Sequence, residues 1–102
     1  MVIITRAALR AFALAHPDAA AALEDWYQHV LAADWANGAA VRQSFRTADY
    51  VGNERFVFNI KGNHYRLIAS VAFSTRTVYI KFVGTHREYD AIDATTIEFI
   101  KP

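Results

Sequence analysis

Hydrophobic residues in the first part of the chain recur at the spacing of helices that bury one side. Val2–Ile4 is a short apolar run typical of a strand, and Thr5 is placed to cap a helix that must end before Pro17. The apolar positions of Asp18–Trp35 follow the i, i+3, i+4 and i+7 spacing of a second helix. Its apolar stripe consists of Leu23, Trp26, Tyr27, Val30 and Leu31. We therefore expect a short strand followed by two helices.

After Asn37-Gly38, which marks a break, the pattern changes from helical to alternating. A short helical turn is expected over Ala39–Ser44, and Phe45–Asn53 has the composition of a loop. Three strand-like runs follow, over Arg55–Ile60, His64–Ser74 and Val78–Val83. The turn-forming residues between them, Lys61–Asn63 and Ser74–Thr77, predict two consecutive hairpins. Gly84 would close this three-stranded meander.

The last part of the chain is expected to hold one short helix and one more strand. Thr85 is placed to cap a helix over His86–Ile92, and Thr95–Ile100 has the composition of a strand. The order of the elements, helices first and then a sheet that they cover on one face, predicts an α+β fold. At 102 residues the chain has the size of one domain, spanning 1–102.

Alternation along the three runs sorts their side chains onto two faces of the sheet. The bulkier apolar set, which should meet the helices, consists of Phe56, Phe58, Ile60, Tyr65, Leu67, Ala69, Val71, Phe73, Val78, Ile80 and Phe82. Val83 is expected on the opposite face. The polar side chains of that opposite face are Asn59, Lys61, Arg66, Tyr79 and Lys81. Because the cations among them come from adjacent strands, the arrangement favours an anion-binding face over a merely solvated one.

Charge is unevenly distributed along the chain. The net charge is only +1, yet Arg55–Arg87 carries six Lys and Arg residues and no acid between its ends. The first fifty residues, in contrast, carry four basic and five acidic side chains. A cationic span of this kind is a typical footprint for a polyanion such as RNA. The count alone is equally consistent with charges that scatter over a solvated surface.

The composition excludes several kinds of chemistry. The chain has no cysteine, which excludes disulfides, thiolate metal sites and thiol catalysis. Its four histidines lack metal-ligand spacing, and neither a glycine-rich phosphate loop nor a nucleophile elbow is present. We therefore expect neither a metal nor a cofactor. No apolar run approaches the length of a membrane span and no signal architecture is present, so we expect a cytoplasmic protein without a membrane partner.

The remaining side chains are those needed to cleave a phosphodiester without a metal. Such cleavage requires an acid or base that titrates near neutrality and a cation that stabilises the charged transition state. His86 meets the first requirement, and Tyr89 lies on the same side of the expected helix. Arg66 and Lys81 meet the second, and Tyr79 or Tyr89 is suited to stack on a base of single-stranded RNA. Taken singly, His86 would more simply bond local backbone and Tyr89 would pack in the core. Their nearness to the cationic face favours the catalytic interpretation.

Two motifs resemble the HigB-type toxins of the RelE-like superfamily. Residues 58–68, FNIKGNHYRLI, resemble the family pattern F-N-[IV]-x-G-N-x-[YL]-R-[LV]. Residues 78–90, VYIKFVGTHREYD, resemble the pattern V-x-I-[KR]-x-[VIF]-x-T-H-x-E-Y-D. Two motifs at the matching separation are far more specific than either alone, and the likeness spans most of residues 1–93. Many of these toxins are markedly basic, whereas this chain is not.

The resemblance implies a fold, a function and partners. The implied fold is a RelE-like small sandwich, with an N-terminal strand and two helices packed on an antiparallel-rich sheet. The implied function is that of a toxin in a type II toxin–antitoxin system. Such a toxin is a metal-independent endoribonuclease that cleaves translated mRNA, typically on the ribosome, through attack by the ribose 2′-OH. The implied partners are mRNA, the ribosome and a HigA-like helix-turn-helix antitoxin, through which alone the toxin would meet operator DNA.

The resemblance also assigns roles to individual residues. Arg66 sits where the superfamily keeps a phosphate-binding arginine. Lys81 and His86 lie where catalytic basic residues are usual, and Tyr89 resembles the family's C-terminal tyrosine. The predicted catalytic residues are therefore Arg66, Lys81, His86 and Tyr89, and the predicted RNA-binding residues are Arg55, Asn59, Lys61, Asn63, His64, Tyr79 and Arg87. Two other hypotheses stay open: a non-catalytic RNA-binding module that uses the same face, and a structural subunit whose sheet face binds a protein.

Overall fold

The computed structural model describes residues 1–98. Its strands form one sheet, and other parts of the chain cover both faces of that sheet. The strands are β1 (Val2–Ile4), β2 (Asp49–Gly52), β3 (Arg55–Ile60), β4 (Tyr65–Ala72) and β5 (Thr77–Thr85). The helices are α1 (Arg6–Ala15), α2 (Ala20–Ala32), α3 (Gly38–Ser44) and α4 (His86–Asp90). Two 3-10 turns complete the list, η1 (Pro17–Ala19) before α2 and η2 (Phe73–Thr75) between β4 and β5.

The five strands form a mixed sheet in the order β1-β5-β4-β3-β2. Strands β2 to β5 pair antiparallel with their neighbours, whereas β1 runs parallel to β5. β4 is therefore the central strand, and its two hairpin partners flank it. The predicted α+β class, the N-terminal strand and the three-stranded meander are confirmed.

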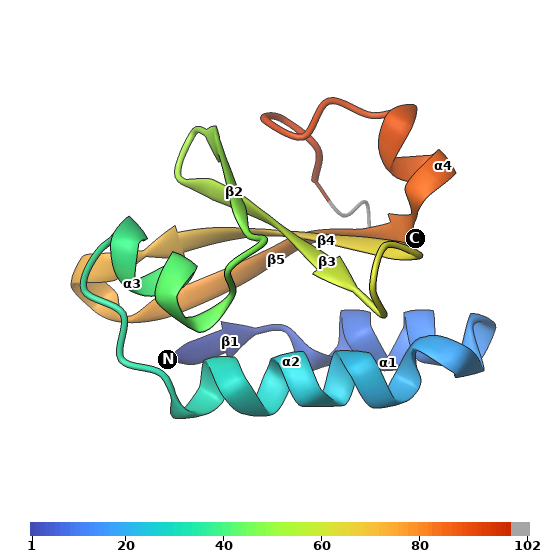
Figure 1. Cartoon of the computed structure of the whole chain (residues 1–102), viewed down its shortest axis with the longest axis horizontal. Helices are drawn as coiled ribbons and strands as arrows, with labels where there is room; N and C mark the ends of the chain where they lie inside the picture. The colour runs from blue at the N-terminus through green and yellow to red at the C-terminus, as the bar shows by residue number, and fades with distance from the viewer. Residues whose placement is uncertain (99–102) are drawn as a thin grey trace.

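The sheet is covered on both faces at its centre (Figure 1). α1 and α2 lie side by side under one face, and α4 with the C-terminal segment, residues 91–98, lies over the other. Leu67 faces the helices and Ile68 faces away from them, yet both are 0% exposed. The sheet face that the sequence predicts to bind an anion is therefore partly covered by α4 and the C-terminal segment.

The core beneath the sheet comes from α2 and from alternate residues of β3, β4 and β5. Three members of the predicted helical stripe, Leu23, Trp26 and Val30, are buried. The Trp26 ring packs edge-on against Phe58, with ring centroids 5.4 Å apart. Leu31 was placed in the same stripe by its spacing, but its side chain is 46% exposed. Helical periodicity therefore identified most of the buried face and overestimated its width.

The composition predicts a loop over Phe45–Asn53, and this prediction is wrong because the segment contains β2. Tyr50 of β2 packs on Phe56 of β3, with ring centroids 5.2 Å apart. The residues that join the two strands, Asn53 and Glu54, have φ of 52° and 62°. Positive φ at both central residues is the signature of a two-residue hairpin turn of type I′. Gly52-Asn53 therefore marks the hairpin between β2 and β3.

The predicted second helix is shorter than its apolar pattern, since α2 begins at Ala20 after η1 and ends at Ala32. Trp35 lies beyond the helix and is buried, with its indole N–H donating to the Ser44 hydroxyl at 2.9 Å.

The first helix ends before Pro17 as predicted, although the Thr5 side chain makes no capping hydrogen bond. No helix within residues 1–98 is long and apolar enough to cross a membrane.

The predictions for the C-terminal third need three corrections. Gly84 does not close the last meander strand but lies within β5, which runs on to Thr85. The following helix ends at Asp90 rather than at Ile92. Of the predicted strand Thr95–Ile100, residues 95–98 form no strand, and 99–100 lie outside the described residues.

A bulge shifts the register between β4 and β5. Ile68 pairs with Phe82 while the next residue, Ala69, pairs with Ile80, so Lys81 is an extra residue on β5. One inserted residue reverses the face that the following side chains take. Val83 therefore belongs to the helix-side core, and Phe82 lies on the opposite face, the reverse of the simple alternation.

We expect Leu67→Ala to destabilise the fold by about 2–5 kcal/mol, because the side chain is fully buried in the central strand and its removal leaves a cavity. Denaturant unfolding of the purified chain measures the change. Leu14→Ala is the matched control, because Leu14 is 84% exposed and should cost no more than about 0.5 kcal/mol. Equal losses in the two variants would contradict the assignment of the core.

Candidate active site

Several predicted site residues gather at one end of the sheet, where β4 begins and β5 ends. Asn59 of β3 pairs with Arg66 of β4, and Arg66 pairs in turn with Gly84 of β5. Because α4 begins two residues after Gly84, it carries His86 and Tyr89 beside this row. Arg66, His86 and Tyr89 form the candidate active site and are named the active-site cluster below.

The guanidinium of Arg66 is half-buried and is held by backbone carbonyls. Its Nη1 donates to the carbonyl oxygens of Asn63 at 3.3 Å and Tyr65 at 3.4 Å. Its Cζ lies 5.9 Å from the centre of the Tyr89 ring, within the range of a cation–π contact. No carboxylate within residues 1–98 forms an ion pair with Arg66. Its charge and its remaining N–H groups are therefore available to an anionic ligand.

A capping box fixes the start of α4 and with it the position of His86. The Thr85 hydroxyl accepts a hydrogen bond from the Glu88 backbone N–H at 3.1 Å, and the Glu88 carboxylate accepts one from the Thr85 N–H at 2.7 Å. The His86 backbone N–H donates to the carbonyl of His64 at 3.2 Å. α4 is thereby tied both to the end of β5 and to the hairpin between β3 and β4.

The imidazole of His86 is held by a carboxylate one helical turn further on. Nδ1 lies 3.1 Å from Asp90 Oδ2, and because an ionised carboxylate can only accept, Nδ1 carries the hydrogen. In the neutral ring Nε2 then keeps its lone pair and can take up a proton. The His86 side chain is 47% exposed, so a substrate can reach it. Asp90 was not singled out from the sequence, although its spacing of four residues from His86 on a helix is the available signal.

Lys81 and Arg55 lie farther along the sheet and bind the C-terminal segment. Lys81 Nζ donates to Glu98 Oε1 at 2.9 Å, and Arg55 Nη2 donates to the other oxygen of the same carboxylate at 2.5 Å. Arg55 also donates to two backbone carbonyls of the segment and is only 4% exposed. The structure therefore pairs Lys81 with the C-terminal segment, and it buries the predicted RNA-binding Arg55.

Alternation places Lys61 beside Asn59 on the face away from the helices, but the structure turns it toward the helical layer. Lys61 has a φ of +52°, and its Nζ donates to Asp18 Oδ2 at 3.0 Å. The Tyr65 hydroxyl lies 2.7 and 2.8 Å from the two oxygens of the same carboxylate. Hydrogen bonds from Tyr65 and then Lys61 hold the pKa of Asp18 below its ordinary value, and Asp18 raises the pKa of Tyr65. These contacts tie η1 to the hairpin between β3 and β4.

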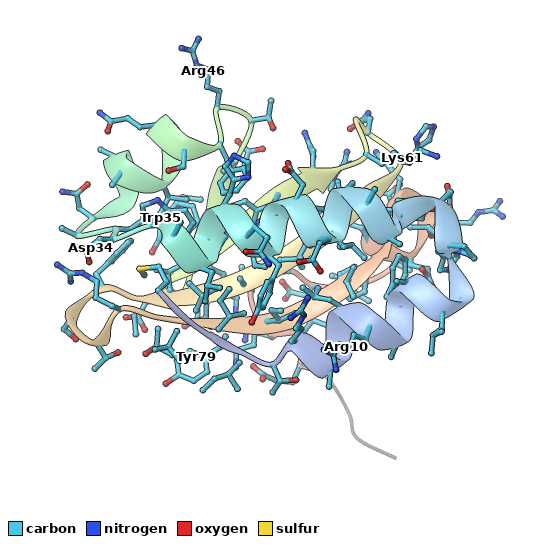
Figure 2. All side chains as sticks on the ribbon, turned by 90° about the horizontal axis from the view of Figure 1, so that it is seen from below. Arg10, Asp34, Trp35, Arg46, Lys61 and Tyr79 are labelled. Atoms are coloured by element: carbon cyan, nitrogen blue, oxygen red, sulfur yellow. The ribbon has the colours of Figure 1, made fainter. Side chains whose placement is uncertain are left out.

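The other predicted RNA-binding residues divide between two regions. Asn63 and His64 are exposed in the hairpin beside the active-site cluster, and Arg87 is exposed on α4. Tyr79 lies on the outer part of the sheet, where its ring centre is 5.8 Å from Lys81 Nζ (Figure 2). Figure 2 also shows Lys61 at the hairpin end of the molecule, away from Asp34 and Trp35 at the other end.

The cluster combines a cation, a histidine with an available nitrogen and a phenol. These groups can neutralise charge on a phosphate and can move protons to or from its ester oxygens. Within the described residues, no three His, Asp or Glu side chains lie close enough together to hold a metal ion. Among the reactions open to these three side chains, acid–base cleavage of a phosphodiester can use all of them.

Comparison with known proteins points to one family. The chain matches the model of the HigB_toxin family, described as the RelE-like toxic component of a toxin–antitoxin system, over residues 19–92. It is 29% identical over 94 residues to the mRNA interferase HigB of Escherichia coli O6:H1, covering 90% of this chain and 91% of that protein. It is 43% identical over 42 residues to the mRNA interferase toxin HigB of Escherichia coli K12, covering 41% of this chain and 40% of that protein. The region matched by the family includes the whole active-site cluster.

We expect Asp18→Asn to make the free energy of unfolding less dependent on acidic pH. The carboxyl pKa is lower in the folded chain, so the folded state binds fewer protons than the unfolded state below the ordinary aspartate pKa of roughly 4. The stability from Asp18 is therefore present above that range and lost as pH falls through the folded-state pKa. Urea unfolding at a series of pH values measures the slope, and Tyr65→Phe should reduce it in part. An unchanged slope in Asp18→Asn would contradict this assignment.

Proposed function

Because this chain belongs to the HigB_toxin family of RelE-like toxic components of toxin–antitoxin systems, we propose that it is an endoribonuclease that cleaves mRNA. The observation that carries the proposal is the approach of the Arg66 guanidinium to within 5.9 Å of the Tyr89 ring, on the helix that also carries His86. No carboxylate within residues 1–98 pairs with this arginine. Two relatives are named mRNA interferases, which supports the same activity for this chain.

In the proposed reaction the ribose 2′-OH attacks the adjacent phosphorus. A bond forms between the 2′ oxygen and phosphorus while the bond to the 5′ oxygen breaks, leaving a 2′,3′-cyclic phosphate and a 5′-OH. Arg66 stabilises the additional negative charge that develops on the phosphate oxygens. His86 and Tyr89 transfer the protons: one takes the proton of the 2′-OH, and the other gives a proton to the departing 5′ oxygen.

The residues around the cluster would hold the nucleotides on either side of the cleaved bond. Asn59 lies next to Arg66 in the sheet, while Asn63 and His64 are exposed in the adjoining hairpin. Arg87 is exposed on the same helix as His86 and Tyr89. Hydrogen-bonding side chains and a cation in this arrangement are suited to the backbone and bases of single-stranded RNA.

The membership of a toxin–antitoxin family implies an antitoxin partner. We propose that this partner is a HigA-like protein with a helix-turn-helix domain, encoded next to the toxin, and that the toxin meets operator DNA only through it. We further propose that the toxin acts in the cytoplasm on mRNA during translation, with the ribosome presenting the message. A small adjacent reading frame for a helix-turn-helix protein is the first observation to seek.

Replacing Arg66 or His86 by alanine should lower the rate of mRNA cleavage by about 10²–10⁴-fold, because each change removes charge stabilisation or proton transfer from the transition state. Primer extension on mRNA after induction without the antitoxin measures the cuts, and growth arrest is the cellular readout. Both variants should still fold, because neither side chain is fully buried.

Arg46→Ala and His29→Ala are the matched controls, since they remove the same kinds of side chain from exposed positions outside the cluster. Figure 2 shows Arg46 projecting away from the rest of the molecule. Both controls should arrest growth like the unchanged chain. Growth arrest of unchanged strength in Arg66→Ala and His86→Ala would refute the site. Intact message with the unchanged chain, together with salt-dependent RNA binding, would instead indicate the non-catalytic RNA-binding module.

Asp90→Ala should lower cleavage by roughly three- to tenfold, the worth of one hydrogen bond that fixes the His86 ring. Asp90→Asn should restore part of this loss, since its amide oxygen can still accept the Nδ1 hydrogen. This rescue separates a positioning role from a structural one, because it depends on an acceptor for the Nδ1 hydrogen and not on the charge of the carboxylate. Cleavage by Asp90→Asn that is as slow as cleavage by Asp90→Ala would argue against a positioning role for Asp90.

A further inference from the structure

A carboxylate of the C-terminal segment is paired with Lys81, which the sequence predicts to be a catalytic residue. Lys81 Nζ lies 2.9 Å from Glu98 Oε1, and the two side chains are 23% and 55% exposed. Both residues line an open groove of about 820 Å³ between α1 and β5. The pair is therefore a surface contact that a ligand can reach, and not a buried ion pair of the core.

The C-terminal segment is anchored so that it presents Glu98 at this point. The guanidinium of Arg55 donates to the carbonyl oxygens of Ala94 at 3.2 Å and Ile97 at 2.5 Å, as well as to the Glu98 carboxylate. The Asn53 side chain donates to the carbonyl of Thr95 at 2.7 Å. Because the anchors are largely to backbone, they would hold the segment in place even when the Glu98 carboxylate turns away from Lys81.

The backbone of Lys81 is offset along β5 from the residue that pairs with Arg66. It is the extra residue of the bulge, three residues before Gly84, the partner of Arg66 on β5. Three residues of extended chain span roughly 10 Å. At that separation the two cations serve different phosphates along one strand of RNA more readily than they serve one phosphorus atom.

We propose that Lys81 is a phosphate subsite for a nucleotide that flanks the cleaved bond, and that Glu98 occupies this subsite until RNA displaces the carboxylate. The proposal rests on the proposed function, since it names a further contact of the same RNA. A carboxylate and a phosphate offer an ammonium group the same kind of anionic oxygen, so the two compete for it. Lys81 and Arg55 also hold the pKa of Glu98 below its ordinary value, so the competing group is charged at neutral pH.

Removing the competing charge should strengthen RNA binding. Exposed ion pairs are weak, so Glu98→Gln should bind a short oligonucleotide roughly two- to fivefold more tightly than the unchanged chain. The probe is a single strand with 2′-O-methyl riboses, which lacks the attacking hydroxyl and stays intact. Because RNA displaces Glu98 in the unchanged chain as well, both chains form the same phosphate contacts, and the slope of log affinity against log salt should stay the same.

Glu24→Gln is the matched control. Glu24 pairs with Arg6 at 2.7 Å, is 49% exposed and lies on the helical layer, so the variant makes the same change of charge elsewhere. It should bind the probe as the unchanged chain does. Equal affinity gains in Glu98→Gln and Glu24→Gln would reduce the effect to net charge and overturn the subsite.

The double variant Lys81→Met/Glu98→Gln assigns any gain to Lys81. In this double variant the C-terminal segment is held as it is in Glu98→Gln. A gain in RNA affinity that came from a loosened segment would therefore persist, and that result would overturn the proposal. Loss of the gain, with a larger effect of Lys81→Met in the Glu98→Gln background than in the unchanged chain, would support it. Binding of the uncleavable probe does not depend on catalysis. A failure of the proposed function would show separately, as intact message with the unchanged chain.

Discussion

The pairing of β4 with β5 is the constraint on which the rest of the structure depends. It places Arg66 beside Gly84 and delivers the chain directly into α4, so that the cluster needs no long connecting loop. The bulge within the same pair returns Val83 to the core and leaves Lys81 as an extra residue. This strand pair thus determines that Val83 packs in the core and how far Lys81 lies along β5 from the partner of Arg66.

The roof over the second sheet face follows from the same strand pair. With Ile68 and Phe82 on that face, a fully solvated sheet surface would leave large apolar side chains in water. α4 and the C-terminal segment cover them, and Ile68 is fully buried as a result. The segment is held by Arg55, a cation that would be costly to bury without partners and that finds three acceptors there. Hydrophobic cover and the hydrogen bonds of Arg55 therefore act together to close the middle of this sheet face.

Local signals predicted what depends on neighbours in sequence. The meander and the cap at Thr85 follow from alternation, turn residues and short spacings. The residues that the sequence did not reveal are partners across the fold. Asp18 is 43 residues from Lys61, and Glu98 is 17 residues from Lys81, so no periodicity connects them. The bulge was equally hidden, because an inserted residue leaves no mark on composition.

The span Arg55–Arg87 has no acid between its ends in the sequence, but the fold brings acids from other parts of the chain to it. Of its six cations, four form ion pairs with carboxylates from outside the span: Arg55 and Lys81 with Glu98, Lys61 with Asp18, and Arg76 with Asp34. Arg66 and Arg87 have no such partner within residues 1–98, and both lie at the active-site end. Affinity for single-stranded RNA grows with the number of phosphates that unpaired cations can neutralise. A span with only two cations outside such pairs should hold free RNA weakly while still placing charge at the reacting phosphate. Weak binding of this kind suits an enzyme whose message is positioned by another body, which is the physical support for the ribosome in our proposal.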